Sequence, residues 1–146
     1  MLGKLTRVEI NEVLRANTIG RIGVSVDGRT YVVPVTYVYD GDAVYGHTRQ
    51  GQKVRMMRKN PAVCFEVDEI RDMANWRCVI AQGTYEELSG DMAVAAAKLI
   101  HARLSPLTRS ETAGPAGRTG RTHVSYRIRL RERSGRYERG ARGRKR

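Results

Sequence analysis

The chain is poor in cysteine and has no long apolar run. Its 146 residues include two cysteines, Cys64 and Cys78, both in apolar, strand-like surroundings. We expect them to be reduced core residues of a cytoplasmic protein, although a disulfide stays open if their strands pair. No apolar stretch approaches the roughly 18 residues of a membrane-spanning helix. The N-terminal residues lead into an amphipathic helix and not into the apolar region of a signal peptide, so no membrane association is expected.

Acidic residues are scarce compared with basic ones. The chain has 15 Asp and Glu against 27 Lys and Arg, which gives a net charge of +12. Residues 127–146 carry ten Arg or Lys and two Glu, so this short segment holds +8 of that charge. The remaining body is only mildly basic, which argues against a nucleic-acid binder built on the whole chain. Nucleic-acid contact through the tail is the weaker alternative, because Tyr137 is its one aromatic residue for base stacking.

Residues that bind metals or act as catalysts are also few. The three histidines, His47, His101 and His123, and the two cysteines do not show the spacing of a zinc site, so no metal is predicted. No carboxylate or nucleophile is spaced with His47 to suggest a catalytic triad. His47 is either a structural hydrogen-bonding residue or a residue that acts beside a ligand.

What the sequence does contain is a series of short strands joined by turns. Asp27-Gly28 and Asp40-Gly41 are hairpin signals, and Pro34 interrupts a β-branched run, which marks an edge strand, a bulge or a place where a ligand lies. Strands are predicted over 21–26, 30–39, 43–46, 62–67, 76–85 and 124–131. Hairpin-linked strands in this order favour an α+β fold, mainly β, built as a six-stranded antiparallel split β-barrel.

Two or three helices are expected to flank these strands. Thr6 and Glu9 form a capping box for a helix over 7–16. Shorter periodic segments predict helices over 53–59 and 91–104. Residues 1–133 are interpreted as one domain, and 134–146 as a basic, Gly/Arg-rich tail that is disordered.

The stretch over 43–68 carries the strongest functional signal. It reads as a strand, a polar Gly-containing loop, a basic helix and a second strand. Unpaired N–H groups at the start of that helix suit an anion, so we expect a ligand phosphate there. The loop nearly matches a nucleotide-binding P-loop, but Gln52 intervenes before Lys53 and Val54 replaces the required hydroxyl residue. The hairpin topology also argues against a P-loop, which leaves a phosphate cradle or a plain solvated helix.

Several segments together resemble a known family. They are Gly20-Arg21-Ile22-Gly23, the run over 33–41, Val44-Tyr45-Gly46-His47, Gly51-Gln52-Lys53, the run over 60–68, and Trp76-Arg77-Cys78-Val79-Ile80. In this order they are similar to the FMN-binding split-barrel family related to pyridoxamine 5′-phosphate oxidase, and most similar to its nitroimidazole-resistance (Nim-type) branch. The resemblance implies a homodimer with FMN in a groove at the dimer interface. The C-terminal substrate signature of true pyridoxamine phosphate oxidases is missing.

The resemblance also assigns residues to the two ends of the flavin. At the ring end, it implies that backbone groups line the isoalloxazine at Pro34, Val35, Thr36 and Tyr37. It places His47 beside the ring, where we expect this side chain to be the catalytic residue.

At the other end, the resemblance implies a phosphate loop that contains Thr48, Gly51 and Lys53. Trp76 and Arg77 match a strand start that faces the flavin of the partner subunit. Trp76 is also the only tryptophan of the chain, and it could equally be a packing residue at the rim.

The predicted function is that of an FMN-dependent oxidoreductase that reduces a small organic acceptor. Nitro compounds are among the candidate acceptors, and NAD(P)H is the candidate electron donor. The alternative is a non-enzymatic carrier or sensor that binds flavin, a deazaflavin or haem, because members of this superfamily differ in cofactor and fold alone does not settle function.

Overall fold

The computed structural model describes residues 1–107 and 123–141. Within them lie eight strands, three α-helices and one short 3₁₀ helix. The strands are β1 (Leu2–Lys4), β2 (Ile19–Val26), β3 (Arg29–Thr36), β4 (Val38–Tyr39), β5 (Ala43–Arg49), β6 (Ala62–Asp72), β7 (Asn75–Leu88) and β8 (His123–Glu138). The helices are α1 (Arg7–Ala16), α2 (Gln52–Lys59), α3 (Gly90–Leu104) and η1 (Ser105–Leu107).

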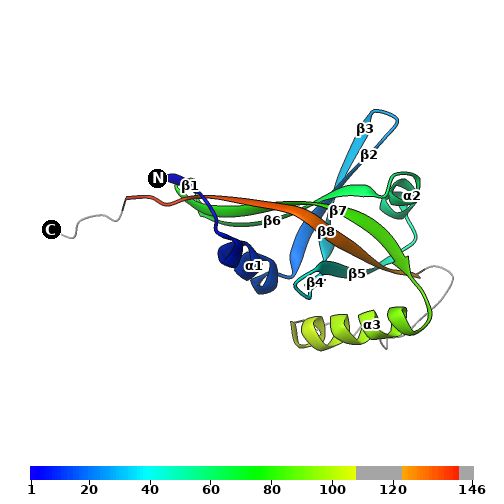
Figure 1. The fold of residues 1–146 in the computed structure, drawn as a ribbon. Helices are drawn as coiled ribbons and strands as arrows, with labels where there is room; N and C mark the ends of the chain where they lie inside the picture. Colours follow the sequence, from blue (N-terminus) through cyan, green and yellow to red (C-terminus); the bar gives the residue numbers. More distant parts are fainter. Residues whose placement is uncertain (108–122, 142–146) are drawn as a thin grey trace.

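The strands form one antiparallel sheet in the order β3-β2-β6-β7-β8-β5-β4, and β1 also pairs with β8. The long strands β6, β7 and β8 run through the middle of the molecule (Figure 1). One edge of β8 pairs with β7, while the other edge pairs with β5 near its start and with β1 near its end. No ladder in the described part of the chain joins β3 to β4, so the mainly β, split-barrel-like sheet is open.

The predicted count of six strands was too low. Strand β1 was missed, and the run predicted over 30–39 is divided into β3 and β4 at Tyr37. The Tyr37 N–H donates to the Thr18 carbonyl at 2.9 Å, and its hydroxyl donates to the Leu14 carbonyl at 2.7 Å. Its ring packs edge-on against Phe65 with the centroids 4.9 Å apart. These contacts turn the chain into the core and separate the two strands.

Two predicted boundaries also differ from the structure. The strand predicted over 62–67 continues to Asp72, where a short turn leads into β7, and Glu69 lies opposite Arg77 in the β6–β7 ladder. Strand β8 continues to Glu138, five residues past the predicted domain end at 133, and its Gly135 carbonyl accepts a hydrogen bond from Leu5. Residues 108–122 of the predicted loop and 142–146 of the predicted tail lie outside the described residues.

The three helices sit at three different places on the sheet (Figure 1). Helix α1 begins with the predicted capping box, in which Thr6 Oγ1 accepts from the Glu9 N–H and Glu9 accepts from the Thr6 N–H. It packs against β6 and β7, α2 packs against β2, and α3 packs against β4 and β5. No helix among the described residues is long and apolar enough to span a membrane.

The core lies between the inner sheet face and the buried sides of α1 and α2. Its fully buried side chains include Val13, Ile22, Met57, Phe65 and Val79. Cys64 and Cys78 are both free, as predicted, since Cys64 lies opposite Gln82 and Cys78 lies opposite Asp68 in the ladder.

Phe65 lies at the centre of this core. It is fully buried, it contacts Tyr37, and a Cβ added at Gly20 would lie 2.5 Å from its ring. Phe65→Ala should therefore lower the free energy of unfolding by about 3–5 kcal/mol. Val8→Ala is the control, because Val8 is 68% exposed on α1 and should change stability by less than ~0.5 kcal/mol. Urea unfolding measures the free energy of unfolding of both variants. Equal values for Phe65→Ala and Val8→Ala would contradict this packing.

Candidate functional site: the junction of strand β5 and helix α2

The loop between β5 and α2 leaves the start of the helix without a side-chain cap. Gly51 is the N-cap residue, with extended backbone angles of φ −147° and ψ −161°. Its carbonyl accepts from the Arg55 N–H at 3.1 Å, which closes the first helical turn. The N–H groups of the first turn have no partner within a helix, and their dipoles make this end positive. The sequence prediction of an anion-binding geometry at this junction matches the local backbone.

Lys53 adds a full positive charge to this helix start. Its side chain is half-buried, and partial loss of water lowers its pKa. No salt bridge in the described part of the chain involves Lys53, so its charge is not compensated by a neighbouring carboxylate. A partly buried ammonium without a counter-ion, beside a positive helix end, favours an anionic ligand such as a phosphate.

His47 lies opposite Ser125 in the β5–β8 ladder, and its ring faces that of His123, the diagonal neighbour on β8. The two rings stack with centroids 5.3 Å apart and planes 8° apart. His47 Nδ1 lies 3.1 Å from Ser125 Oγ, within hydrogen-bonding distance. Loss of water around the His47 ring lowers its pKa, and repulsion by His123 lowers it further. His47 is therefore a neutral imidazole at pH 7 that can donate and accept hydrogen bonds.

Thr48 and Gly51 occupy the short path between His47 and Lys53. Thr48 is half-buried, and its hydroxyl donates to the Arg49 carbonyl at 3.2 Å. No side-chain cap closes the helix start at Gly51. The structure thus brings together four predicted residues, from His47 to Lys53, along a single chain segment.

The predicted ring-binding segment lies on an edge strand. Pro34 is opposite Arg21, Val35 is opposite Gly20, and no other described strand forms a ladder with the second edge of β3. This confirms the edge position that a proline requires, because proline has no N–H to donate. Strand β3 also contacts β5, which carries His47.

Tyr37 differs from the other members of that segment. It is 1% exposed, and both its hydroxyl and its N–H are used in the hydrogen bonds to Leu14 and Thr18. Pro34, Val35 and Thr36 therefore keep the position predicted for a ring-lining backbone, whereas the N–H of Tyr37 is not available to a ligand.

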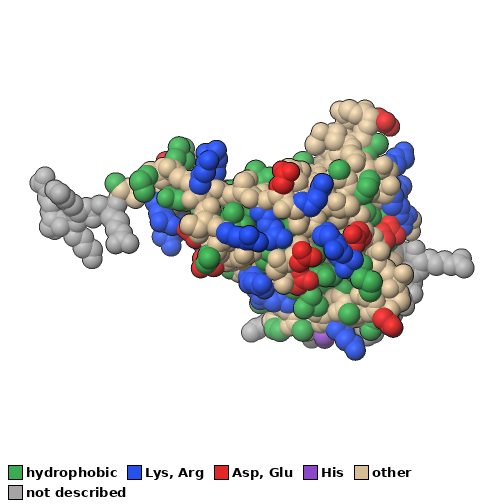
Figure 2. Space-filling view, in the orientation of Figure 1, with side chains coloured by type: hydrophobic (Ala, Val, Ile, Leu, Met, Phe, Trp, Pro, Cys, Tyr) green, Lys and Arg blue, Asp and Glu red, His purple; other side chains and the backbone are tan. Residues whose placement is uncertain are grey.

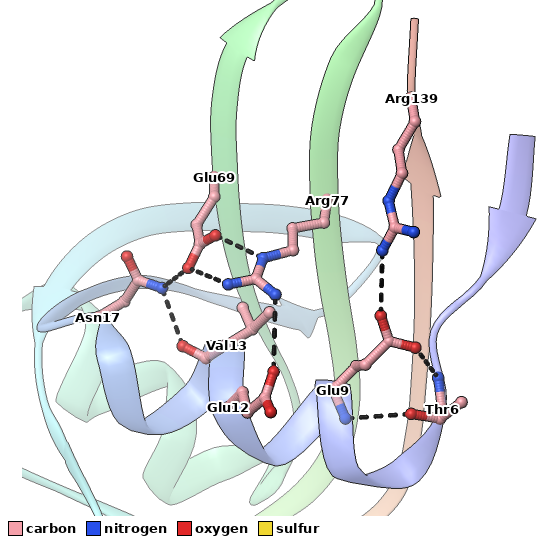
Figure 3. A network of polar contacts seen from close by, with 8 residues as sticks. All are labelled: Thr6, Glu9, Glu12, Val13, Asn17, Glu69, Arg77 and Arg139. Atoms are coloured by element: carbon pink, nitrogen blue, oxygen red, sulfur yellow. Dashed lines mark hydrogen bonds and ion pairs between the residues drawn. The ribbon is translucent and has the colours of Figure 1, made fainter. Parts of the chain in front are cut away.

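Arg77 belongs to a separate polar network at the other end of the sheet (Figure 3). Its Nε lies 2.5 Å from Glu69 Oε2, its Nη2 donates to Glu69 Oε1 at 3.3 Å, and its Nη1 lies 3.9 Å from Glu12 Oε2 of α1. Glu69 also accepts from Asn17, which donates to the Val13 carbonyl at the end of α1. The hydrogen bond from Arg77 lowers the pKa of Glu69. Arg77 thus ties α1 to the sheet.

Trp76 lies beside this network, with its indole Nε1 donating to Glu138 Oε2 at 3.2 Å. It lines an open hollow of about 540 Å³ together with Ile70, Arg77, Tyr137 and Arg139. Trp76 is opposite Glu138 in the sheet and His47 is opposite Ser125, so roughly 40 Å of β8 separates them. One chain therefore does not bring Trp76 and Arg77 to the His47–Lys53 junction.

Sequence reasoning missed the residues that surround His47. Ser125 and His123 lie on the same face of β8, because they are two residues apart. Their approach to His47 depends on the β5–β8 pairing. That pairing joins segments 78 residues apart, as the His47–Ser125 contact shows. The only available signal was the alternation of β8 itself, which does not name its partner strand.

The fold is that of a split-barrel-like protein, and helix α2 begins without a side-chain cap. Residues 6–137 match the family model described as pyridoxamine 5′-phosphate oxidase, so the chain belongs to this family. An uncharacterized protein of Rhizobium meliloti (strain 1021) is 33% identical over 84 residues, which cover 58% of this chain and 56% of that protein. The match thus spans about half the length of that curated relative.

Solved structures share the fold. A FAD-binding protein from Mesorhizobium loti is 33% identical, with a TM-score of 0.77, over 96% of this chain and 98% of its own. A candidate 5-nitroimidazole antibiotic resistance protein from Bacteroides thetaiotaomicron is 16% identical, with a TM-score of 0.73, over 94% of this chain and 87% of its own. The family recognised from the sequence is confirmed, and the second structure supports the fold alone.

The electrostatics of His47 can be tested directly. Its imidazole should titrate below the ordinary value of about 6.5, as measured by NMR of the ring protons. His123→Gln removes a positive neighbour and should raise the pKa of His47 part of the way back, because the loss of water remains. His101→Gln, on the exposed side of α3, should leave it unchanged. A His47 pKa at or above the ordinary value would contradict the described surroundings.

Proposed function

We propose that this chain is a flavin-dependent oxidoreductase, with the flavin phosphate at the start of α2 and the flavin ring between β3 and His47. The observation that carries the proposal is the uncompensated Lys53 ammonium at an uncapped helix start. Its support from relatives is membership of the pyridoxamine 5′-phosphate oxidase family and the FAD-binding protein that is 33% identical. The sequence predicted FMN, and the ring, ribityl chain and first phosphate assigned here are common to FMN and FAD.

The residues at the junction fit a phosphate in both charge and hydrogen bonding. Lys53 supplies an ammonium, the first N–H groups of α2 supply neutral donors, and the Thr48 hydroxyl can add another. Gly51 carries no side chain that would occupy this space. Charge-assisted hydrogen bonds of this kind contribute about 1.5–3 kcal/mol each.

The residues near His47 fit the ring end. The backbone of Pro34, Val35 and Thr36 offers the unpaired edge of β3 to a flat ligand. A neutral His47, held by Ser125, can hydrogen-bond to a ligand or pass a proton to a substrate near neutral pH. When bound, the flavin would supply the redox chemistry, and the protein would orient it and exclude water.

A homodimer would complete the site. Trp76 and Arg77 of β7 lie too far from His47 to serve the flavin of their own chain, so their predicted role requires the flavin of a partner subunit. Arg77 would act through its ion pairs with Glu69 and Glu12, which fix its position. Trp76 would provide an aromatic surface at the rim of the hollow that it lines.

The proposed reaction takes electrons from a reduced donor such as NAD(P)H and gives them to a small organic acceptor, with nitro compounds as the first class to try. A carrier or sensor would bind the same flavin without this transfer. The oxidoreductase and the carrier are distinguished by reducing the bound flavin with dithionite and mixing the reduced protein with a nitroaromatic compound. An oxidoreductase should be reoxidised faster by that compound than by air, and a carrier should not.

Lys53→Ala should weaken flavin binding by roughly tenfold to a hundredfold, because one charge-assisted hydrogen bond is lost. The variant should keep its fold, since Lys53 forms no salt bridge with a described residue. The dissociation constant for FMN is measured by quenching of flavin fluorescence, and unfolding is followed by circular dichroism. Lys98→Ala, on the exposed side of α3, is the matched control. Unchanged flavin binding in Lys53→Ala would defeat the phosphate assignment.

His47→Ala should retain the flavin but slow its reoxidation by the organic acceptor about a hundredfold, because general acid–base groups contribute about 10²–10⁴ in rate. Stopped-flow absorbance of the reduced protein gives this rate. His101→Ala should behave like the unsubstituted chain. A wild-type rate in His47→Ala would reduce His47 to a structural role.

A further inference from the structure

A cleft of about 480 Å³ lies between the β2–β3 hairpin and α2. None of the residues predicted from the sequence as cofactor ligands lines it. Figure 1 shows α2 beside this hairpin, and in Figure 2 Lys and Arg side chains gather over the same region. The lining residues are Val26, Asp27 and Arg29 from the hairpin, and Gln52, Arg55, Met56 and Lys59 from α2.

Backbone elements hold both walls of the cleft. The four lining residues of α2 follow the spacing i, i+3, i+4 and i+7, which places them on one face of the helix. The opposite wall ends in a tight turn with positive φ at Asp27 and Gly28. The side-chain amide of Asn60 donates to the Ser25 carbonyl at 2.8 Å, which ties the end of α2 to the hairpin. The position of the walls is therefore set by the fold.

The charge of the lining matches that of a phosphate monoester. Arg29, Arg55 and Lys59 are exposed, and none forms a salt bridge with a described residue. Arg55 donates one long hydrogen bond of 3.4 Å to Gln52. Asp27 is the one acidic residue of the lining, so the lining carries a net charge of +2. A phosphate monoester carries about −1.5 to −2 at pH 7 and would neutralise this charge, whereas a phosphodiester with its single negative charge would not.

An apolar surface and a planar cation adjoin these charges. Val26 is half-buried and Met56 is buried, and both line the cleft. The planar guanidinium of Arg29 can stack on a purine ring, for which the two apolar side chains provide a second contact surface. A volume of 480 Å³ is within the roughly 300–1,000 Å³ of small-molecule sites. The cleft therefore fits a purine nucleoside that carries a phosphate monoester.

We propose that this cleft binds the 2′-phosphoadenosine end of NADPH, so that the electron donor is NADPH and not NADH. This inference rests on the proposed function, in which a nicotinamide donor reduces a flavin bound between β3 and His47. The two donors differ only in the 2′-phosphate, which is a monoester, and an arginine near the ribose is the usual group that accommodates it. Arg55 and Lys59, one helical turn apart on α2, would hold this phosphate, and Arg29 would stack on the adenine ring.

Strand β3 connects the cleft with the proposed position of the flavin ring. It begins at Arg29 in the cleft and reaches Pro34 five residues later, which is roughly 17 Å along an extended strand. An extended dinucleotide covers a distance of this order, with the adenine at one end and the nicotinamide at the other. No other described strand forms a ladder with the second edge of β3, so this edge is open to the donor.

The test measures the dissociation constants of NADP⁺ and NAD⁺ on the 146-residue chain by isothermal titration calorimetry. NADP⁺ should bind at least tenfold more tightly, as expected when the 2′-phosphate gains a charge-assisted hydrogen bond. The nucleotide 2′-AMP should displace NADP⁺, whereas inorganic phosphate at the same concentration should not. Equal displacement by inorganic phosphate would overturn the inference, because the cleft would then accept any phosphate.

Variants of the lining residues locate the 2′-phosphate. Arg55→Gln and Lys59→Gln should each weaken NADP⁺ binding about tenfold and leave NAD⁺ binding unchanged. Arg29→Ala should weaken the binding of both dinucleotides alike, because the adenine ring is common to them. Arg7→Gln and Lys98→Gln remove one exposed charge from α1 and α3 and are the matched controls. Equal weakening of NADP⁺ and NAD⁺ by Arg55→Gln and Lys59→Gln would contradict the inference, because it would reflect a general attraction of anions.

The outcomes separate this inference from the proposed function. Equal dissociation constants for NADP⁺ and NAD⁺, or no binding of either, would overturn the inference and leave the proposed function intact, because another donor can reduce a flavin. A tenfold preference for NADP⁺ in a chain that binds no flavin would overturn the proposed function and keep the cleft as a 2′-phosphate site. In the chain with bound FMN, reduction of the flavin should show a KM at least tenfold lower for NADPH than for NADH, and Arg55→Gln should remove this difference.

Discussion

The pairing of β8 on both of its edges is the constraint on which the rest of the structure depends. Strand β7 follows β8 along one edge, whereas β5 and β1 share the other. The β5 ladder places His47 opposite Ser125 and ends at Arg49, just before the start of α2. The histidine and the helix start are thus held together by one strand pair. The same strand carries Glu138 to Trp76 at the far end, which separates Trp76 and Arg77 from the His47–Lys53 junction within one chain.

Basic residues of this chain differ in whether a neighbouring carboxylate compensates their charge. Arg21 is paired with Glu66 and Asp68, and Arg77 with Glu69. At the start of α2 the situation differs, because Lys53 has no salt bridge within the described part of the chain. The net charge of +12 therefore says less about ligand binding than the pairing of individual basic residues with carboxylates. Positive charge that the fold leaves unpaired in one place is what a phosphorylated cofactor would neutralise.

Local signals in the sequence predicted much of this fold. The capping box at Thr6 and Glu9 predicted the start of α1, and an edge strand was one of the three alternatives predicted at Pro34. The division at Tyr37 was not predictable, because it depends on a buried hydroxyl reaching the Leu14 carbonyl. The loop from His47 to Lys53 was found because it is contiguous. The partners of His47 on β8 were not predicted, because strand pairing over long sequence distances leaves no local pattern.

The central claim is that the start of α2 holds a flavin phosphate in this chain. Its most direct test is to record backbone amide chemical shifts by two-dimensional NMR while FMN, and then riboflavin, is added. FMN should shift the amides from Gly51 to Val54 most strongly, together with those of His47 and Thr48, and riboflavin should shift those near His47 but not those at the helix start. Amide shifts confined to another part of the sheet, or equal shifts at the helix start with both compounds, would contradict the account.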